Sequence, residues 1–174
     1  MGNKPSIVVR DMMPDDCTAI SDAFAAQGWV KPPALYRRYL DECQAGVRTA
    51  LVAERAGQFA GYVTIRWESD YPPFREAGVP EIVDLNVLIA YQRQGIGAAL
   101  MDEAERRIAG ISATAGIGVG LTADYGPAQV MYGRRGYEPD GCGLHRAGGP
   151  VRRGDQIVVD DAVTLYLVKR FSAQ

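Results

Sequence analysis

The chain has 174 residues, of which 47% are hydrophobic and 23% charged, a composition typical of proteins that fold around a buried core. Its formal net charge of −2 leaves no excess of Lys and Arg for a phosphate backbone, so we expect no nucleic-acid partner. The longest apolar stretch, 82–90, is far shorter than the roughly 20 residues of a membrane-spanning helix. We therefore expect one domain over residues 1–174 that does not bind membranes.

Cysteine and histidine are scarce in this chain. The three cysteines, Cys17, Cys43 and Cys142, are widely spaced and include no CxxC pair, and His145 is the single histidine. So few soft ligands predict that there is no metal site. The odd cysteine count and the lack of a secretory signal pattern at the N-terminus favour a cytoplasmic protein.

The first part of the chain predicts a strand, two helices and a hairpin. Residues 7–10 are strand-like, and a proline with two aspartates then starts a helix that extends to Ala26. Two prolines restart the chain, and a second helix ends near Gly46. The strands 49–54 and 59–67 are joined by an Ala-Gly-Gln turn.

The segment 68–80 contains three prolines and a glycine, and aromatic residues stand at Trp67, Tyr71 and Phe74. We expect a long loop there rather than a regular element, because Pro and Gly interrupt helices and strands. Loops of this length often carry function.

Two strand-turn-helix units follow. Residues 82–88 are strand-like, and Gly95 opens a helix whose apolar side chains recur at every fourth position. These side chains are Ile96, Leu100, Ala104 and Ile108. Residues 117–122 form the next strand, which a short helix follows. A glycine-rich loop or hairpin over 141–154 and a last strand over 163–171 complete the sheet.

The segment 92–98, Gln-Arg-Gln-Gly-Ile-Gly-Ala, lies between the strand and the helix of the first unit. Free N–H groups and the helix dipole make such a helix N-terminus an anion site. Gly95 and Gly97 would let a pyrophosphate approach the main chain without interference from a Cβ atom. The alternative is that the two glycines only allow a tight turn and that this turn binds no ligand.

Nucleotide-binding fingerprints do not explain these glycines. A dinucleotide-binding turn needs a third glycine where Leu100 stands, and the chain contains no P-loop. The series Gly116, Gly118 and Gly120 fails in the same way, because Leu121 occupies the third position. We interpret these glycines as one face of a strand that allows close approach.

Two motifs resemble those of a known family. Residues 85–88, Leu-Asn-Val-Leu, and 91–101, Tyr-Gln-Arg-Gln-Gly-Ile-Gly-Ala-Ala-Leu-Met, are similar to the coenzyme-A-binding motif of the GNAT superfamily of N-acetyltransferases, whose core is Q/R-x-x-G-x-G/A. Residues 128–137, Ala-Gln-Val-Met-Tyr-Gly-Arg-Arg-Gly-Tyr, resemble its second signature, a helix that ends in Tyr, a basic residue, Gly and an aromatic residue. The order of the elements matches the family over almost the whole chain.

The resemblance implies an α/β fold of the mixed α+β type. Its centre is a twisted, mostly antiparallel sheet with a splayed parallel strand pair and flanking helices. Pantetheine would enter where the strands 82–88 and 117–122 part, and would pair with the backbone near Leu85 and Val87. The pyrophosphate would bind the main-chain amides of the following turn. These amides belong to Arg93, Gln94, Gly95, Ile96, Gly97 and Ala98.

Two positions depart from the family pattern. Many members have an asparagine that contacts the cofactor seven residues before the helical tyrosine, but this chain has Tyr125 there, so no contact is carried over. Ile89 replaces a proline that commonly follows the motif strand, which affects only the exit angle of the turn.

The resemblance implies an N-acetyltransferase that moves an acetyl group from acetyl-CoA to an amine by direct attack in a ternary complex. The acceptor is a small-molecule or peptide amine that the sequence does not identify. The oligomeric state is open as well, with a homodimer among the alternatives. The competing hypothesis is a non-catalytic acyl-CoA-binding sensor, which would need neither a proton donor nor a base.

Acetylation of an amine needs a base that takes the proton of the amine and an acid beside the departing thiolate. Tyr132 matches the acid position of the family, and the alternative is a tyrosine that only packs its helix. Glu81, at the start of the motif strand, is the expected base, and the alternative is an exposed surface glutamate.

Asp84 is the second candidate for the base. Simple alternation along the strand places it on the opposite face from Val83, Leu85 and Val87. His145 would have a suitable pKa, but the glycine-rich segment shows no partner for it, so we expect it on the surface or in a loop.

By the same resemblance, the acceptor pocket is built by the first two helices, the loop after the third strand and the segment before the last strand. The pocket residues expected from this are Tyr36, Tyr39, Trp67, Tyr71, Phe74 and the region of Leu144. The nearby carboxylates are Glu68, Asp70, Glu76 and Glu81. Aromatic and acidic side chains favour a cationic or amine-bearing acceptor, although Arg66 and Arg75 lie among them.

Overall fold

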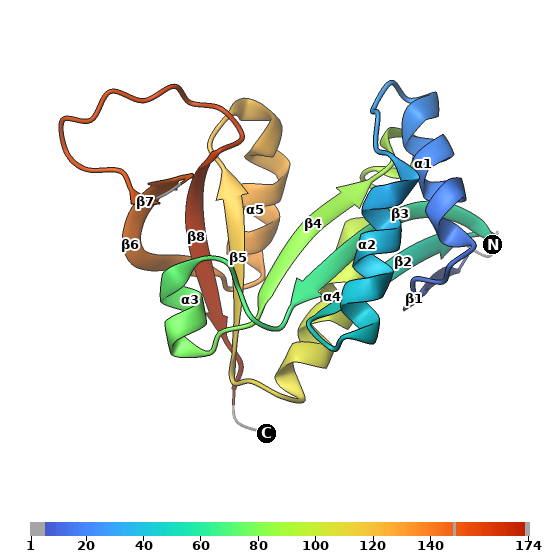
Figure 1. Cartoon of the computed structure of the whole chain (residues 1–174), viewed down its shortest axis with the longest axis horizontal. Helices are drawn as coiled ribbons and strands as arrows, with labels where there is room; N and C mark the ends of the chain where they lie inside the picture. The colour runs from blue at the N-terminus through green and yellow to red at the C-terminus, as the bar shows by residue number, and fades with distance from the viewer. Residues whose placement is uncertain (1–5, 148, 173–174) are drawn as a thin grey trace.

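The computed structural model describes residues 6–147 and 149–172. Its strands form one eight-stranded sheet in the order β1-β2-β3-β4-β5-β8-β6-β7 (Figure 1). The strands are β1 (Ile7–Asp11), β2 (Arg48–Arg55), β3 (Gln58–Arg66), β4 (Glu81–Val87), β5 (Thr114–Gly120), β6 (Glu138–Arg146), β7 (Gly149–Pro150) and β8 (Val163–Arg170). Within the described residues only β4 and β5 pair in parallel, so the expected mixed sheet is confirmed.

Helices cover both faces of the sheet. They are α1 (Asp16–Ala26), α2 (Pro33–Gln44), α3 (Pro72–Ala77), α4 (Ile96–Ala109) and α5 (Gly126–Arg134), with short 3-10 turns η1 (Ile89–Tyr91) and η2 (Ala123–Tyr125). In Figure 1, α1, α2 and α3 lie in front of the sheet and α4 and α5 behind it. No helix in residues 6–147 and 149–172 has the length and apolar character needed to cross a bilayer.

The core lies in two layers, one on each face of the sheet. One layer joins α1 and α2 to the sheet, and the other joins α4 and α5 to it. The four apolar residues expected on one face of α4 are all at most 1% exposed, which confirms the helical period. They are Ile96, Leu100, Ala104 and Ile108.

The expectation of a loop throughout 68–80 is wrong, because α3 forms within this segment. Pro72 and Pro73 occupy the start of the helix, where a missing N–H costs no hydrogen bond. Phe74 is 2% exposed and anchors the helix, and Gly78 ends it in the left-handed conformation with a φ of 63°.

An extra residue in β4 changes the face on which its side chains lie. Two steps along β3, from Tyr62 to Thr64, match three steps along β4, from Asn86 to Val83. Ile82 therefore packs in the α4 layer together with Leu85 and Val87, although it lies three and five positions before them and regular alternation would place it on the opposite face. The expectation that Val83 shares this face is wrong, and Val83 lines a cavity on the other side with Glu81.

The parallel pair of β4 and β5 is short. Only Glu81 with Gly116 and Ile82 with Ile117 are in register, after which the two strands diverge (Figure 1). The non-glycine residue Asp84, two positions after Ile82, has a φ of 58°, which marks the bulge. The splayed pair expected from the family resemblance is thus present.

Three alternate glycines on β5 make room for side chains on the front face of the sheet. A Cβ atom at Gly116 would lie 2.3 Å from the ring of Phe74, and one at Gly120 would lie 2.4 Å from the ring of Tyr125. At Gly118 it would lie 2.8 Å from Thr164. The sequence predicts close backbone approach at this glycine face, and the groups that approach it are side chains instead.

We predict that Gly116→Ala lowers the free energy of unfolding by about 2 kcal/mol, because the ring of Phe74 would have to move. The matched control is Gly133→Ala, an exposed helical position with no atom within 4 Å of the new Cβ. Alanine should be neutral or stabilising there. Urea unfolding of both variants measures the difference, and equal stabilities would contradict tight packing of α3 on β5.

Candidate active site

The turn that enters α4 lies at the carboxyl end of β4. Arg93 and Gly95 have φ values of 56° and 90°, and Gly95 caps the helix. Ile96 is 1% exposed and anchors the first turn, whereas Arg93, Gln94 and Gly95 are exposed. The first N–H groups of a helix have no intrahelical acceptor, so this turn offers several donors to an anion.

The two glycines of the turn have different explanations. Gly95 requires a positive φ, which glycine adopts without strain. A Cβ at Gly97 would meet Val87 Cγ2 at 3.8 Å and Met131 Sδ at 3.9 Å, which are ordinary contacts. The fold itself therefore tolerates a side chain at Gly97, and a bound group is what would need the space.

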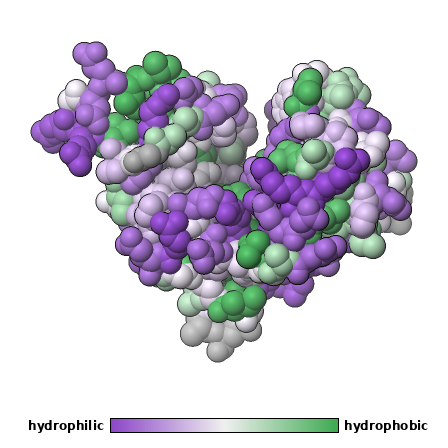
Figure 2. All heavy atoms as spheres, viewed as in Figure 1, coloured by the Kyte–Doolittle hydropathy of each residue, from purple (hydrophilic) through white to green (hydrophobic). Residues whose placement is uncertain are grey.

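A cavity of about 350 Å³ lies where β4 and β5 part. It is lined by Leu85, Gly118, Tyr125 and Tyr132, among others. Figure 2 shows a notch in the molecular surface above this point of the sheet. Tyr132 is 5% exposed, and burial raises the pKa of its hydroxyl to about 12, with a smaller contribution from Tyr125. The hydroxyl therefore keeps its proton at neutral pH and can act as a donor.

A second cavity, of about 700 Å³, lies between α3, β4, β6 and β8. Glu81 and Val83 line it from β4, and Tyr166 lines it from β8. A smaller cavity of about 240 Å³ shares Glu81 with the large one and Tyr125 with the cavity of Tyr132. The three cavities adjoin at the point where β4 leaves β5.

Glu81 is a buried acid with one close hydrogen-bond donor. Its side chain is 6% exposed, and Ser69 Oγ donates to its Oε2 at 2.5 Å. The backbone N–H of Tyr71 in turn donates to Ser69 Oγ at 3.0 Å. Burial raises the pKa of Glu81 above its usual value, although the Ser69 hydroxyl acts in the opposite direction. A raised pKa makes the Glu81 carboxylate a better proton acceptor than an exposed glutamate.

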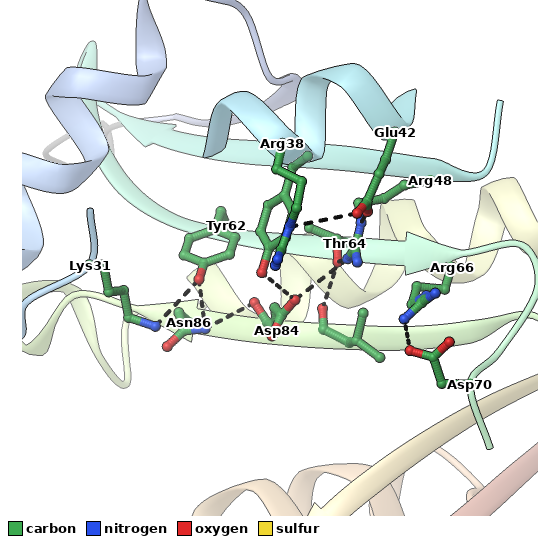
Figure 3. Close-up of polar contacts among 12 residues, drawn as sticks. Lys31, Arg38, Glu42, Arg48, Tyr62, Thr64, Arg66, Asp70, Asp84 and Asn86 are labelled. Carbon is green, nitrogen blue, oxygen red and sulfur yellow. Dashed lines mark hydrogen bonds and ion pairs between the residues drawn. The ribbon is translucent and has the colours of Figure 1, made fainter. Parts of the chain in front are cut away.

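Asp84 belongs to a polar network with α2 and β2 (Figure 3). The Tyr39 hydroxyl donates to Asp84 Oδ2 at 2.8 Å, and Arg48 Nη1 lies 3.5 Å from the same atom. Arg48 is 6% exposed and pairs with Glu42 at 2.5 Å. Asp84 is thus a partner of a buried guanidinium, and the residue also lines the cavity of Tyr132.

An aromatic group forms one wall of the 700 Å³ cavity. The rings of Tyr71 and Tyr166 are stacked with centroids 3.6 Å apart, and His145 meets Tyr71 edge-on at 4.7 Å. The Tyr71 hydroxyl donates to Asp140 Oδ2 at 2.7 Å. His145 therefore lies on β6 against this aromatic group, in a partly buried position.

Several residues expected in the acceptor pocket lie elsewhere. Tyr36 and Tyr39 are 0% and 4% exposed and belong to the core layer under α1 and α2. Trp67 packs on the other layer and donates to Thr49 Oγ1 at 3.1 Å. Two aromatic residues of α3 and the turn before it were also expected in the pocket. Tyr71 lines the large cavity, and the ring of Phe74 packs against Gly116 of β5.

Three residues of the site were not predicted from the sequence. Tyr166 and Thr164 on β8 and Asp161 just before it line both the large cavity and the small one. Tyr166 stands opposite Gly118 in the pairing of β5 with β8. The glycine series on β5 indicated that bulky side chains lie against this strand. It could not indicate which ones, because the neighbouring strand β8 is distant in sequence.

The described residues contain no group of three or more His, Cys, Asp or Glu side chains placed to hold a metal ion.

Solved structures with the same fold include several acetyltransferases. An N-acetyltransferase from Staphylococcus aureus has 13% identity and a TM-score of 0.69 over 95% of this chain and 98% of its own. A ribosomal-protein-alanine N-acetyltransferase from Brucella melitensis has 20% identity and a TM-score of 0.68 over 94% and 99%. The PaiA N-acetyltransferase from Thermoplasma acidophilum, in complex with coenzyme A, has 13% identity and a TM-score of 0.65 over 95% and 99%.

At these identities the solved structures show a common fold. Comparison with curated proteins gave no match. The family model of the acetyltransferase (GNAT) family matches residues 17–137, which is more than half of the chain and includes the α4 turn, β4, β5 and Tyr132. The chain belongs to the GNAT acetyltransferase family.

Proposed function

We propose that the protein, as a single domain over residues 1–174, transfers an acetyl group from acetyl-CoA to an amine. The observation that carries the proposal is the pair of adjoining cavities at the splay of β4 and β5. The buried hydroxyl of Tyr132 borders one, and the buried carboxyl of Glu81 borders the other. A proton donor and a proton acceptor on two sides of one opening suit acyl transfer between two substrates.

The residues of the α4 turn fit the pyrophosphate of coenzyme A. The exposed turn at the helix N-terminus supplies main-chain amide donors from Arg93 to Ala98. The protein could accommodate a side chain at Gly97, so the glycine there leaves room for a bound phosphate. The edge of β4 at Leu85 and Val87 is free of β5 and can pair with the amides of pantetheine. This path leads from the turn to the cavity of Tyr132.

In the proposed reaction the amine attacks the thioester directly while both substrates are bound. Glu81 accepts the proton of the amine, directly or through a water molecule, because its raised pKa lets it hold that proton. Tyr132 donates a proton to the departing thiolate and recovers one from solvent. No covalent acyl-enzyme is needed, since the two cavities adjoin.

The acceptor is a small-molecule or peptide amine. The Brucella melitensis neighbour is a ribosomal-protein-alanine N-acetyltransferase, which supports a peptide amine. The aromatic wall of the large cavity supports a small molecule equally. The free cysteines support a reducing cytoplasm as the setting. A non-catalytic sensor is disfavoured because it would need neither a buried Glu81 nor a buried Tyr132.

We predict that coenzyme A binds with a dissociation constant in the micromolar range and that Gly97→Glu weakens binding about tenfold or more. The added carboxylate would lie at the helix N-terminus, where the pyrophosphate is proposed to bind. Calorimetry checks this, with Gly133→Glu as the matched control, since it adds the same charge at an exposed site on α5. Equal weakening in both variants would contradict the assigned phosphate site.

We predict that Tyr132→Phe lowers kcat about tenfold or more and leaves coenzyme A affinity nearly unchanged, because only the proton donor is lost. Free thiol release with acetyl-CoA and a screen of amines measures the rate. A wild-type kcat with a good acceptor would assign Tyr132 to packing of α5.

We predict that kcat/KM rises with pH as Glu81 loses its proton, with an inflection above the range of an exposed glutamate, because burial raises its pKa. Glu81→Gln should remove this inflection. Ser69→Ala should move it to still higher pH, since the hydroxyl that stabilises the carboxylate is gone. The comparison variant is Asp84→Asn, and loss of the inflection there but not in Glu81→Gln would make Asp84 the base.

A further inference from the structure

Lys31 lies between α1 and α2 and borders the cavity that Tyr132 also lines. With a volume of about 350 Å³, this cavity brings the two side chains to the walls of one small space. Figure 3 shows Lys31 extending toward β4, where Tyr62 and Asn86 lie close to its end. The proposed reaction assigns no role to this amine.

The ammonium of Lys31 is weakly held. Its Nζ donates a long hydrogen bond of 3.4 Å to Tyr62 Oη and lies 5.2 Å from the ring centroid of Phe24. Across residues 6–147 and 149–172 no salt bridge involves Lys31. Lys169, in contrast, lies 2.6 Å from Glu105 Oε2 and is fixed in an ion pair away from the cavities.

The surroundings of Lys31 also favour its neutral form. Partial burial lowers the pKa of the amine below that of an exposed lysine, and the nearby charge of Asp84 opposes the shift. The neutral amine is the form that attacks a thioester. Lys31 therefore combines a position at the cavity with the reactivity of an acceptor.

We infer that Lys31 is a self-acetylation site, whose amine takes the acetyl group of acetyl-CoA bound at the splay of β4 and β5. The inference rests on the proposed function, because it needs acetyl-CoA in that cavity. It adds an acceptor that the chain itself supplies.

The step balances in atoms and charge. The Lys31 ammonium first loses a proton to solvent, and its nitrogen then forms a bond to the acetyl carbonyl carbon while the carbon–sulfur bond breaks. The thiolate takes a proton from Tyr132, and the nitrogen loses its second proton, which restores the tyrosine. The products are acetyl-lysine, the thiol of coenzyme A and one proton in solution.

The sequence supplies its own internal comparison, because the chain has three lysines, Lys4, Lys31 and Lys169, of which Lys4 lies outside the described residues. The full chain is incubated with acetyl-CoA without an added acceptor, and peptide mass spectrometry follows each lysine. We expect acetylation of Lys31 to be about tenfold or more faster than that of Lys169, because Lys31 lines the cavity of Tyr132 and Lys169 does not. The rate constant should not depend on protein concentration, as the transfer is within one molecule.

Three variants complete the test. Lys31→Arg should remove the fast modification and Lys169→Arg should leave it, while Tyr132→Phe should slow it about tenfold without changing the acetylation rate of Lys169. Calorimetry with coenzyme A on each variant shows whether the cofactor site is intact.

The failures of the two proposals can be told apart. An unmodified Lys31 in a protein that binds coenzyme A would overturn the self-acetylation site and leave the proposed function in place. Equal acetylation rates at Lys31 and Lys169 would mean chemical acetylation from solution and would also overturn the self-acetylation site. A Lys31 rate that Tyr132→Phe does not change would have the same meaning. No binding of coenzyme A would overturn both proposals.

Discussion

The divergence of β4 from β5 after two register pairs is the constraint on which the rest of the structure depends. The pairs Glu81 with Gly116 and Ile82 with Ile117 hold the base of the splay, and the extra residue at Asp84 turns β4 away. A non-glycine residue in the left-handed conformation costs about 1 kcal/mol, so the surroundings must hold the bulge in place. The divergence opens the cavities and leaves a strand edge free.

Ion pairs between the bulge and the α2 side of the sheet stabilise this bulge. Arg48 is buried between Glu42 and Asp84, and its guanidinium also donates to Thr64 Oγ1 at 2.5 Å. A buried guanidinium that loses a carboxylate is destabilised by several kcal/mol, so the packing of α2 and the bulge in β4 support each other. Asp84 thus has structural partners in Arg48 and Tyr39, which is why the proposed function assigns the base to Glu81, whose carboxylate accepts from a single hydroxyl donor.

On the opposite side, β8 lies between β5 and β6 and brings its side chains against the glycine face of β5. Tyr166 stands across from Gly118, and the hydroxyl of Tyr125 donates to Asp161 Oδ1 at 3.1 Å. This contact joins the start of α5 to the segment that precedes β8. Tyr132 on α5 and Glu81 on β4, the proposed acid and base, therefore lie at adjoining cavities, since Tyr125 lines both the cavity of Tyr132 and the small cavity of Glu81.

The sequence by itself determined the order of the helices and strands apart from α3, the apolar face of α4 and the turn at Gly95, because these depend on residues close together in the chain. The family resemblance led to the positions of Glu81 and Tyr132. Tertiary structure alone decided the face of Val83, which depends on the register with β3, and the place of Tyr166, which depends on where β8 enters the sheet. The helix α3 escaped prediction because prolines suit both a loop and the first turn of a helix. A cavity is bounded by strands and helices that are distant in sequence, so local periodicity carries no information on which of the many aromatic side chains line it.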